Sequence, residues 1–191
     1  MPETPALDLD PATGWCKTAR RCPSPNFNAR PAGVCIDLLV IHGISLPAGH
    51  YGGPFIEALF LNQLDPHAHA SFADLRDLRV SAHFLIRRDG ALVQFVSTDD
   101  RAWHAGVSSF EGRSGCNDFS IGIELEGCDD EPYASFQYER LIGLTRVLCA
   151  TYPGITPQRI VGHCDIAPGR KTDPGARFDW SGYRAGLTQP R

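Results

Sequence analysis

The sequence lacks an excess of positive charge and a long apolar segment. Its 18 Lys and Arg residues are outnumbered by 22 Asp and Glu residues, which gives a formal net charge of -4. No overall positive field would therefore draw the chain to nucleic acid or to anionic lipid. The longest aliphatic stretches, such as Leu38 to Ile41, are far shorter than the roughly 20 residues that span a bilayer. We expect a protein that binds neither nucleic acid nor a membrane.

The sequence also lacks a C-x-x-C pair and a secretion signal. Its seven cysteines are irregularly spaced, so neither a disulfide framework nor a zinc ribbon is indicated. We expect most of them to be small buried hydrophobic side chains in a reducing compartment. The opening residues 1–10 are acidic and have no basic end or apolar stretch. A cytoplasmic location is the expectation that follows.

Hydrophobic periodicity predicts mixed strands and helices. The pattern indicates strands over 36–41, 80–87, 91–96, 120–126 and 160–166, and helices over 52–63 and 135–151. Asp89-Gly90 separates two apolar runs and is typical of a hairpin turn. The predicted fold class is therefore α/β (α+β), with a mixed central sheet flanked by helices in one domain.

The strand 120–126 has two chemically different faces. Ile121, Ile123 and Leu125 alternate with Glu124 and Glu126. Two neighbouring, partly buried carboxylates raise the pKa of at least one of them, so one could act as a general base. The alternative is that Glu126 faces solvent at the sheet rim beside an Arg, while Glu124 only accepts hydrogen bonds.

Two histidines stand where a rigid scaffold would hold a metal ligand. His42 follows a predicted central strand, and His163 has a similar position. Asp173 lies ten residues after His163 and could complete a site of two histidines and one carboxylate, which leaves one coordination position open. The short-spaced pair His67 and His69 lies in a predicted loop and is a weaker candidate.

Taken together and in order, these segments resemble the AmpD family, cytoplasmic 1,6-anhydro-N-acetylmuramyl-L-alanine amidases of Gram-negative cell-wall recycling. That family belongs to the wider zinc-amidase and peptidoglycan recognition protein superfamily. The resemblance is carried by Gly14-Trp15 and by residues 21–26, 39–42, 44–47, 78–83, 101–108, 116–127, 162–168 and 170–175. It implies one zinc amidase domain over 1–191, with an N-terminal extension of about 1–13 and a catalytic core of about 36–175.

The resemblance also implies roles for five residues. The family's zinc ligands fall on His42, His163 and Asp173, its catalytic glutamate on Glu124, and its oxyanion-stabilising lysine on Lys171. The implied reaction is zinc-dependent hydrolysis of the amide between the lactyl group of anhydro-N-acetylmuramic acid and L-alanine. Such an enzyme serves peptidoglycan recycling, and controls β-lactamase induction indirectly where that circuit exists.

An anhydromuropeptide substrate needs an apolar wall and a cation for its carboxylates. Arg79 is the predicted cation, and Trp103 with His104 would form part of the wall. The alternatives are a surface ion pair for Arg79 and core packing or a lid for the Trp103-His104 pair. The expected partner is this small molecule alone, with the protein acting as a monomer.

Three positions depart from the family pattern. Gly43, Ser71 and Gly115 stand where relatives often have Asn, Tyr and Arg. We expect these changes to affect substrate affinity more than zinc chemistry, because none is a predicted ligand. Two other functions stay open: an amidase acting on intact peptidoglycan, and a muropeptide-binding module without catalysis.

Overall fold

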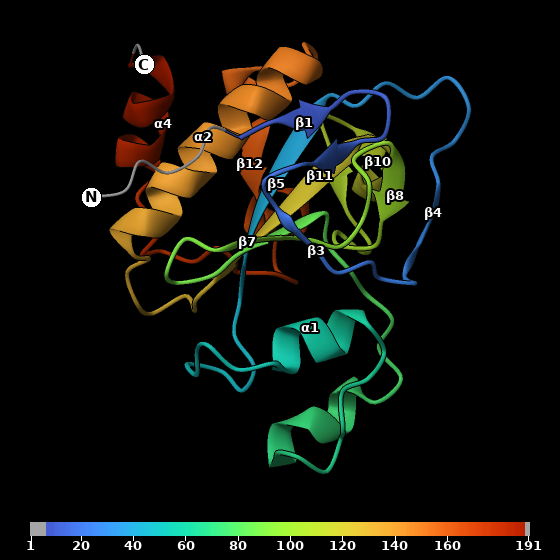
Figure 1. The fold of residues 1–191 in the computed structure, drawn as a ribbon, viewed down its shortest axis with the longest axis vertical. Coiled ribbons are helices and arrows are strands. Elements are labelled where there is room, and N and C mark those ends of the chain that lie inside the picture. The colour runs from blue at the N-terminus through green and yellow to red at the C-terminus, as the bar shows by residue number, and fades with distance from the viewer. Residues whose placement is uncertain (1–6, 190–191) are drawn as a thin grey trace.

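A six-stranded mixed sheet forms the centre of the computed structural model, which describes residues 7–189 (Figure 1). The strand order is β12-β5-β11-β6-β7-β3. These strands are Arg20–Arg21 (β3), Leu38–Ile44 (β5), Phe84–Ile86 (β6), Leu92–Gln94 (β7), Ser120–Glu126 (β11) and Ile160–Gly162 (β12). From β12 to β6 neighbouring strands are parallel, whereas β6 and β7 form an antiparallel pair. The predicted mixed sheet is confirmed.

The remaining elements are short, apart from one long helix. Three two-stranded antiparallel pairs join Leu9–Asp10 (β1) to Trp15–Cys16 (β2), Phe27–Ala29 (β4) to Asp100–Ala102 (β8), and Ser109–Phe110 (β9) to Arg113–Ser114 (β10). The α-helices are Phe55–Phe60 (α1), Ser135–Thr151 (α2), His163–Ile166 (α3) and Trp180–Thr188 (α4). Three 3-10 turns are Ala70–Leu75 (η1), Cys116–Asp118 (η2) and Pro157–Arg159 (η3). Within the described chain, none of the helices has the length and apolar character of a membrane span.

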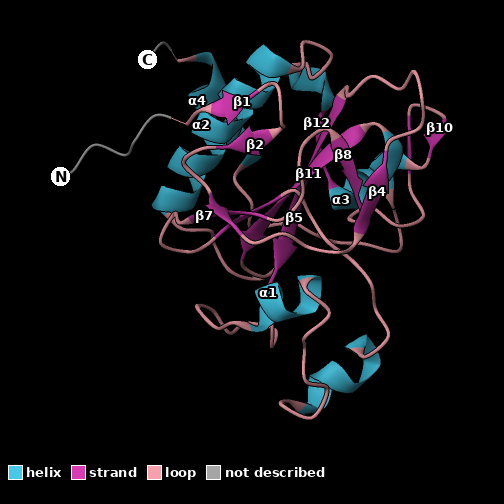
Figure 2. Cartoon of the chain, turned by 45° about the vertical axis from the view of Figure 1, so that its right-hand side comes forward, coloured by secondary structure: helices cyan, strands magenta, loops and turns pink. Residues whose placement is uncertain are grey.

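Helix α2 covers one face of the sheet, and α4 lies against α2 (Figures 1 and 2). The buried side chains of α2, such as Leu141 and Leu144, share a core with Ile121 and Ile123 of β11. This confirms the predicted apolar face of 120–126. By period-two alternation, Glu124 therefore lies on the opposite face of the sheet.

The face opposite α2 is covered by two separate hydrophobic clusters. One joins Ile56 and Phe60 of α1 to Leu85 of β6, which places α1 below the sheet in Figure 1. The other joins Val40 of β5 to Ile166 of α3. The carboxyl ends of β5 and β11 lie between these two hydrophobic clusters. Polar residues on this face of the sheet are therefore held in place from both sides.

The structure corrects several predicted boundaries. The helix expected over 52–63 is limited to α1, because Pro54 precedes it and Asn62 has a left-handed φ of 59°. The extended segment expected over 160–166 ends at Gly162, whose N–H donates to Asp165 Oδ2 over 2.7 Å and so begins α3. The hairpin at Asp89-Gly90 is confirmed, with shorter strands than predicted.

The expectation that most cysteines are buried is wrong. Cys16 and Cys116 are buried, whereas Cys35 is exposed and the other four are partly exposed. All seven are free thiols. Part of the expected N-terminal extension, residues 1–6, lies outside the described residues.

A fully buried histidine links β11 to the segment before β6. His83 Nδ1 accepts from Gly122 N over 3.0 Å, and its Nε2 lies 3.1 Å from Asp100 O. Burial, with the nearby Arg30 guanidinium as the second cause, lowers the pKa of His83 to about 3. The folded protein therefore holds this imidazole neutral at pH values at which an unfolded chain would protonate it.

This burial makes stability depend on pH. Because the unfolded chain binds a proton below about pH 6.5 and the folded chain does not until about pH 3, His83 lowers the free energy of unfolding as the pH falls through that window. The effect amounts to about 2 kcal/mol at pH 5. Urea unfolding of metal-free protein at pH 7 and pH 5 should show a smaller pH-dependent loss for His83→Asn than for wild type. Equal losses in the two proteins would contradict the assignment.

Candidate metal centre and active site

Three predicted ligands meet at the carboxyl end of the sheet. His42 lies near the end of β5, His163 follows β12 directly, and Asp173 comes from the loop before α4. The Nδ1 atoms of the two histidines are 3.0 Å apart, and Asp173 Oδ2 is 3.1 Å from each of them. The histidines are 1% and 4% exposed. In the described part of the chain, this is the group of His, Cys, Asp and Glu residues that could hold a metal ion.

The donor set fits a zinc ion chemically. Burial lowers the pKa of His42 to about 4 despite the adjacent Asp173 carboxylate, so the ring is neutral at pH 7 and can offer a lone pair. Tetrahedral ligands about 2.0 to 2.1 Å from zinc are roughly 3.3 Å apart, close to the spacing of these three atoms. Two nitrogens and one carboxylate oxygen form a typical catalytic zinc set with room for a fourth ligand.

Glu124 lies beside this group on the neighbouring strand. It is paired with His42 in the parallel register of β11 and β5. Its Oε2 atom is buried and has no hydrogen-bond partner. Burial, reinforced by the negative charge of Asp173, raises the pKa of Glu124 well above its ordinary value, although Lys171 opposes the shift. Glu124 thus lies beside the metal-ligand cluster with a buried oxygen that has no hydrogen-bond partner.

The second carboxylate of that strand face has a different environment. Glu126 is 1% exposed, and its Oε1 accepts from Arg87 Nη1 over 2.9 Å and from Gly52 N over 2.7 Å. The Arg partner that the alternative interpretation gave Glu126 is therefore present, whereas the solvent exposure that it gave Glu126 is wrong. Its acceptor capacity is engaged by structural contacts, which leaves Glu124 as the carboxyl group available for chemistry.

A cavity of about 420 Å³ opens over the metal-ligand cluster. His42, Glu124, Lys171, Arg79, Trp103 and His104 are among its lining residues. The chain has two lysines, Lys17 and Lys171. Lys17 forms an exposed ion pair with Asp8, so Lys171 is the lysine placed at the cavity.

The candidate substrate residues occupy different depths of the cavity. Arg79 is exposed, and its Nη1 donates to the backbone oxygens of Arg76 and Leu78, while no ion pair of residues 7–189 includes it. The half-buried Trp103 donates from Nε1 to Asn28 Oδ1 over 2.7 Å. His104 is only 8% exposed. Its role as part of a substrate wall stays a prediction.

The loop pair His67 and His69 does not assemble into a metal site. Both are exposed, and His69 Nδ1 accepts from Ser71 N over 3.2 Å at the start of η1. Ser71 therefore contributes to a turn. Gly115 adopts a left-handed φ of 74°, a conformation that disfavours a side chain such as arginine.

Tyr133 accounts for the presence of glycine at position 43, and the sequence analysis did not identify this tyrosine. Its hydroxyl donates to Pro174 O over 2.9 Å, next to the ligand Asp173. A Cβ atom at Gly43 would overlap this hydroxyl, so the small residue makes room for a contact that holds the Asp173 loop. No local pattern signals such a contact, because the three segments are far apart in sequence.

Arg170 was also missed, although it precedes the predicted Lys171. Its Nη2 donates over 2.7 Å to both Ala105 O and Val107 O, and its side chain lines the cavity. The adjacent basic pair was the available signal. Arg170 ties the loop after Trp103 to the loop that carries Asp173.

Comparison with known proteins agrees with this geometry. The N-acetylmuramoyl-L-alanine amidase family matches residues 30–176. The chain is 57% identical over 175 residues to the 1,6-anhydro-N-acetylmuramyl-L-alanine amidase AmpD of Salmonella typhimurium, over 92% of this chain and 93% of that protein. It is also 57% identical to Escherichia coli AmpD, over 90% and 93% of the two chains.

Solved structures show the same relationship. The crystal structure of a selenomethionine AmpD derivative matches with a TM-score of 0.91 at 56% identity, over 95% of this chain and 99% of that one. The AmiD amidase of E. coli, in complex with the substrate anhydro-N-acetylmuramic acid-L-Ala-D-gamma-Glu-L-Lys, matches with a TM-score of 0.58 at 31% identity, over 82% and 60% of the two chains. The chain therefore belongs to the N-acetylmuramoyl-L-alanine amidase family, and it shares its fold and its enzymatic class with AmpD.

Proposed function

We propose that this protein hydrolyses anhydromuropeptides as a monomeric zinc enzyme of the cytoplasm. The bond cleaved is the amide between the lactyl group of 1,6-anhydro-N-acetylmuramic acid and L-alanine. His42, His163 and Asp173 would bind the zinc ion, while Glu124 and Lys171 would act on the reacting atoms. The reaction would return sugar and peptide to peptidoglycan synthesis.

The buried, unpartnered Oε2 of Glu124 carries this proposal. A carboxyl group that only supports the fold would have its oxygens paired, as those of Glu126 are. Instead, Glu124 lies against the metal-ligand cluster, lines the cavity and has a raised pKa. A raised pKa makes the carboxylate a stronger base, so Glu124 can accept a proton and later return it.

The chain's own residues provide the proton transfers. Zinc, when bound, supplies a Lewis acid that polarises the carbonyl group and makes water more acidic. Glu124 would accept a proton from the attacking water as the new carbon–oxygen bond forms. It would then donate that proton to the nitrogen of L-alanine as the carbon–nitrogen bond breaks, giving a carboxylic acid and a free amine.

Lys171 would stabilise the charge that develops on the carbonyl oxygen. It is the cavity lysine, and its ammonium group is exposed there. A cation at this position favours the transition state more than the ground state, because the negative charge on the oxygen grows during attack.

The substrate class follows from the cavity and from the relatives. The cavity volume of about 420 Å³ is in the range of small-molecule sites. Trp103 and the edge of His104 would contact the sugar, and Arg79 would bind a stem-peptide carboxylate. The AmiD structure contains an anhydromuramic tripeptide. The structure of AmpDh3 from Pseudomonas aeruginosa, which matches this chain with a TM-score of 0.60 at 30% identity, contains an anhydromuramic pentapeptide. Both support a ligand of this kind here.

The first test combines cleavage with metal content. Glu124→Gln should still bind about one zinc per chain, because Glu124 is not a proposed ligand, and it should lose on the order of 100-fold or more in kcat, because the proton acceptor is gone. Wild type, chelated wild type and the variant should be compared for release of stem peptide from a purified anhydromuropeptide. Chelation should abolish wild-type cleavage, and added zinc should restore it.

Different outcomes separate the alternatives. If Glu124→Gln retains nearly full activity, another group is the base. Zinc-loaded wild type that leaves anhydromuropeptide intact but releases peptide from whole peptidoglycan would identify intact cell wall as the substrate. Zinc-loaded wild type that cleaves neither would identify a muropeptide-binding module.

Lys171 is tested separately. Lys171→Met should lower kcat on the order of 100-fold, since the oxyanion loses its cation, with little change in KM or zinc content. Lys17→Met is the matched control, because it removes the other lysine of the chain at an exposed ion pair. Equal kcat values for the two variants would exclude the proposed role of Lys171.

A further inference from the structure

Both metal-binding histidines rest on the same two-residue segment, His104-Ala105. We propose that His104, itself oriented by Ser120, is a positioning residue that fixes the orientation and tautomer of His42, while the adjacent Ala105 carbonyl does the same for His163. The inference rests on the proposed metal site. Hydrogen bonds to this segment leave Nδ1 of both histidines unprotonated, so that both atoms can bind the metal.

Ser120 determines which nitrogen of His104 carries the proton. Its Oγ lies 2.6 Å from Cys116 O, and a carbonyl oxygen can only accept, so the single hydroxyl proton is directed there. Ser120 Oγ also lies 3.1 Å from His104 Nε2. Since its proton is already engaged, Ser120 must accept at this contact, and His104 Nε2 carries the proton.

His104 in turn determines which nitrogen of His42 carries the proton. A neutral imidazole with a protonated Nε2 has a lone pair on Nδ1. His104 Nδ1 lies 2.9 Å from His42 Nε2 and therefore accepts from it. His42 is left with an unprotonated Nδ1, the atom that lies 3.0 Å from His163 Nδ1 and 3.1 Å from Asp173 Oδ2.

The second histidine is oriented by the next residue of the same segment. His163 Nε2 lies 3.1 Å from Ala105 O, a shorter contact than the 3.5 Å between this nitrogen and Arg170 Nη2. The carbonyl can only accept, so Nε2 donates to it and His163 Nδ1 is unprotonated. Two bare nitrogens and a carboxylate oxygen then face one another with no proton between them. This arrangement of lone pairs favours a cation at their centre.

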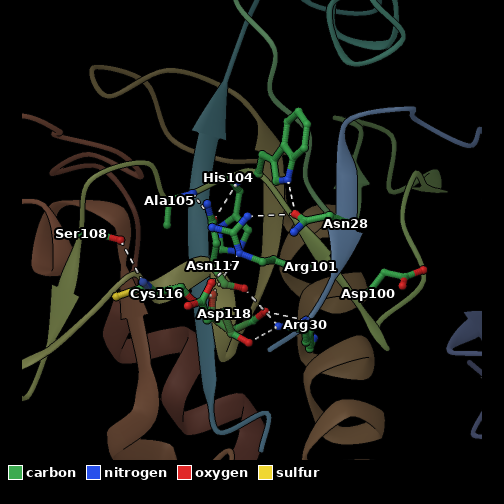
Figure 3. A network of polar contacts seen from close by, with 12 residues as sticks. Asn28, Arg30, Asp100, Arg101, His104, Ala105, Ser108, Cys116, Asn117 and Asp118 are labelled. Atoms are coloured by element: carbon green, nitrogen blue, oxygen red, sulfur yellow. Dashed lines mark hydrogen bonds and ion pairs between the residues drawn. The ribbon is translucent and has the colours of Figure 1, made fainter. Parts of the chain in front are cut away.

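The segment itself is held rigidly. Asn117 Oδ1 accepts from His104 N over 3.0 Å and from Ala105 N over 2.8 Å, and Asn117 is buried. Figure 3 shows these bonds converging from the labelled Asn117 onto His104 and Ala105. One buried amide oxygen thus fixes the backbone of both supporting groups.

Gly122 provides the space that the His104 ring needs. A Cβ atom at position 122 would lie 2.5 Å from His104 Cγ and 2.6 Å from Nδ1, closer than side-chain atoms pack. The ring therefore lies directly on the backbone of β11, two residues before Glu124. This close packing restricts the ring to the orientation in which both of its nitrogens find their partners.

The test uses variants that keep or remove the acceptor for His42. His104→Asn retains an oxygen close to the place of Nδ1, whereas His104→Leu removes the acceptor at similar volume. Outer partners of metal-binding histidines commonly contribute about 10-fold to 100-fold in metal affinity. We expect a loss of that size in zinc affinity for His104→Leu and substantial rescue for His104→Asn, measured by competition with a chromophoric chelator.

Nitrogen-15 NMR of the ring nitrogens in metal-free protein is the second measurement. Wild type should show His42 with a protonated Nε2 and a bare Nδ1, and His104→Leu should lose that single tautomer. Ser120→Ala covers the case in which His104→Leu fails to fold, and it should loosen the His42 tautomer and weaken zinc binding. Ser24→Ala is the control, because it removes a buried hydroxyl that bonds to Phe60 O and touches no histidine.

The outcomes distinguish this inference from the proposed function. Folded His104→Leu and Ser120→Ala proteins that keep both wild-type zinc affinity and the wild-type tautomer would overturn it. If wild type binds zinc without cleaving anhydromuropeptide, the proposed function fails, whereas affinity and tautomer still decide the role of His104. If wild type bound no zinc, the metal-free spectrum would still decide it: a mixed His42 tautomer would overturn the inference, and a single one would support it.

Discussion

The parallel pairing of β5 with β11 on one side and β12 on the other is the constraint on which the site depends. In this register His42 is opposite Glu124, and Ile41 is opposite Gly162, so His163 follows at the level of His42. Backbone hydrogen bonds of a buried sheet allow little displacement, and a slip of one residue would turn every side chain to the other face. The spacing of the chemical groups is therefore set by the core before any polar contact forms.

Burial at this edge of the sheet has two consequences. Loss of water favours neutral imidazoles, which are the form that binds a metal, and it raises the pKa of Glu124, which makes its carboxylate a stronger proton acceptor. The same loss of water would destabilise the fold if many polar atoms lacked partners. The surrounding network limits that cost, because the neighbouring histidines, Ser120 and Asn117 all have hydrogen-bond partners. Glu124 Oε2 differs from them, since it has no partner.

The sequence predicted those features that repeat locally or that coincide with a family motif. Alternation located β11 and its carboxylate face, and the resemblance located His42, His163 and Asp173 before the geometry brought them together. Local patterns could not reveal that Glu126 is buried against Arg87, since Arg87 directly follows a different strand, β6. Likewise, Tyr133 fills the space above Gly43 only because the chain returns there after about 90 residues. Contacts of that kind are properties of the assembled fold.

The two clusters that support the open face of the sheet belong to different parts of the chain. The metal-ligand group lies on β5, the first residue of α3 and the loop after α3, whereas the outer wall of the cavity includes Leu59, Phe60 and Leu75 from the region of α1 and η1. Substitutions or insertions in that outer region would reshape what the cavity accepts without moving a ligand atom. The shape of the outer cavity wall and the placement of the metal-ligand group therefore depend on different segments of the chain, so one can change while the other stays as it is.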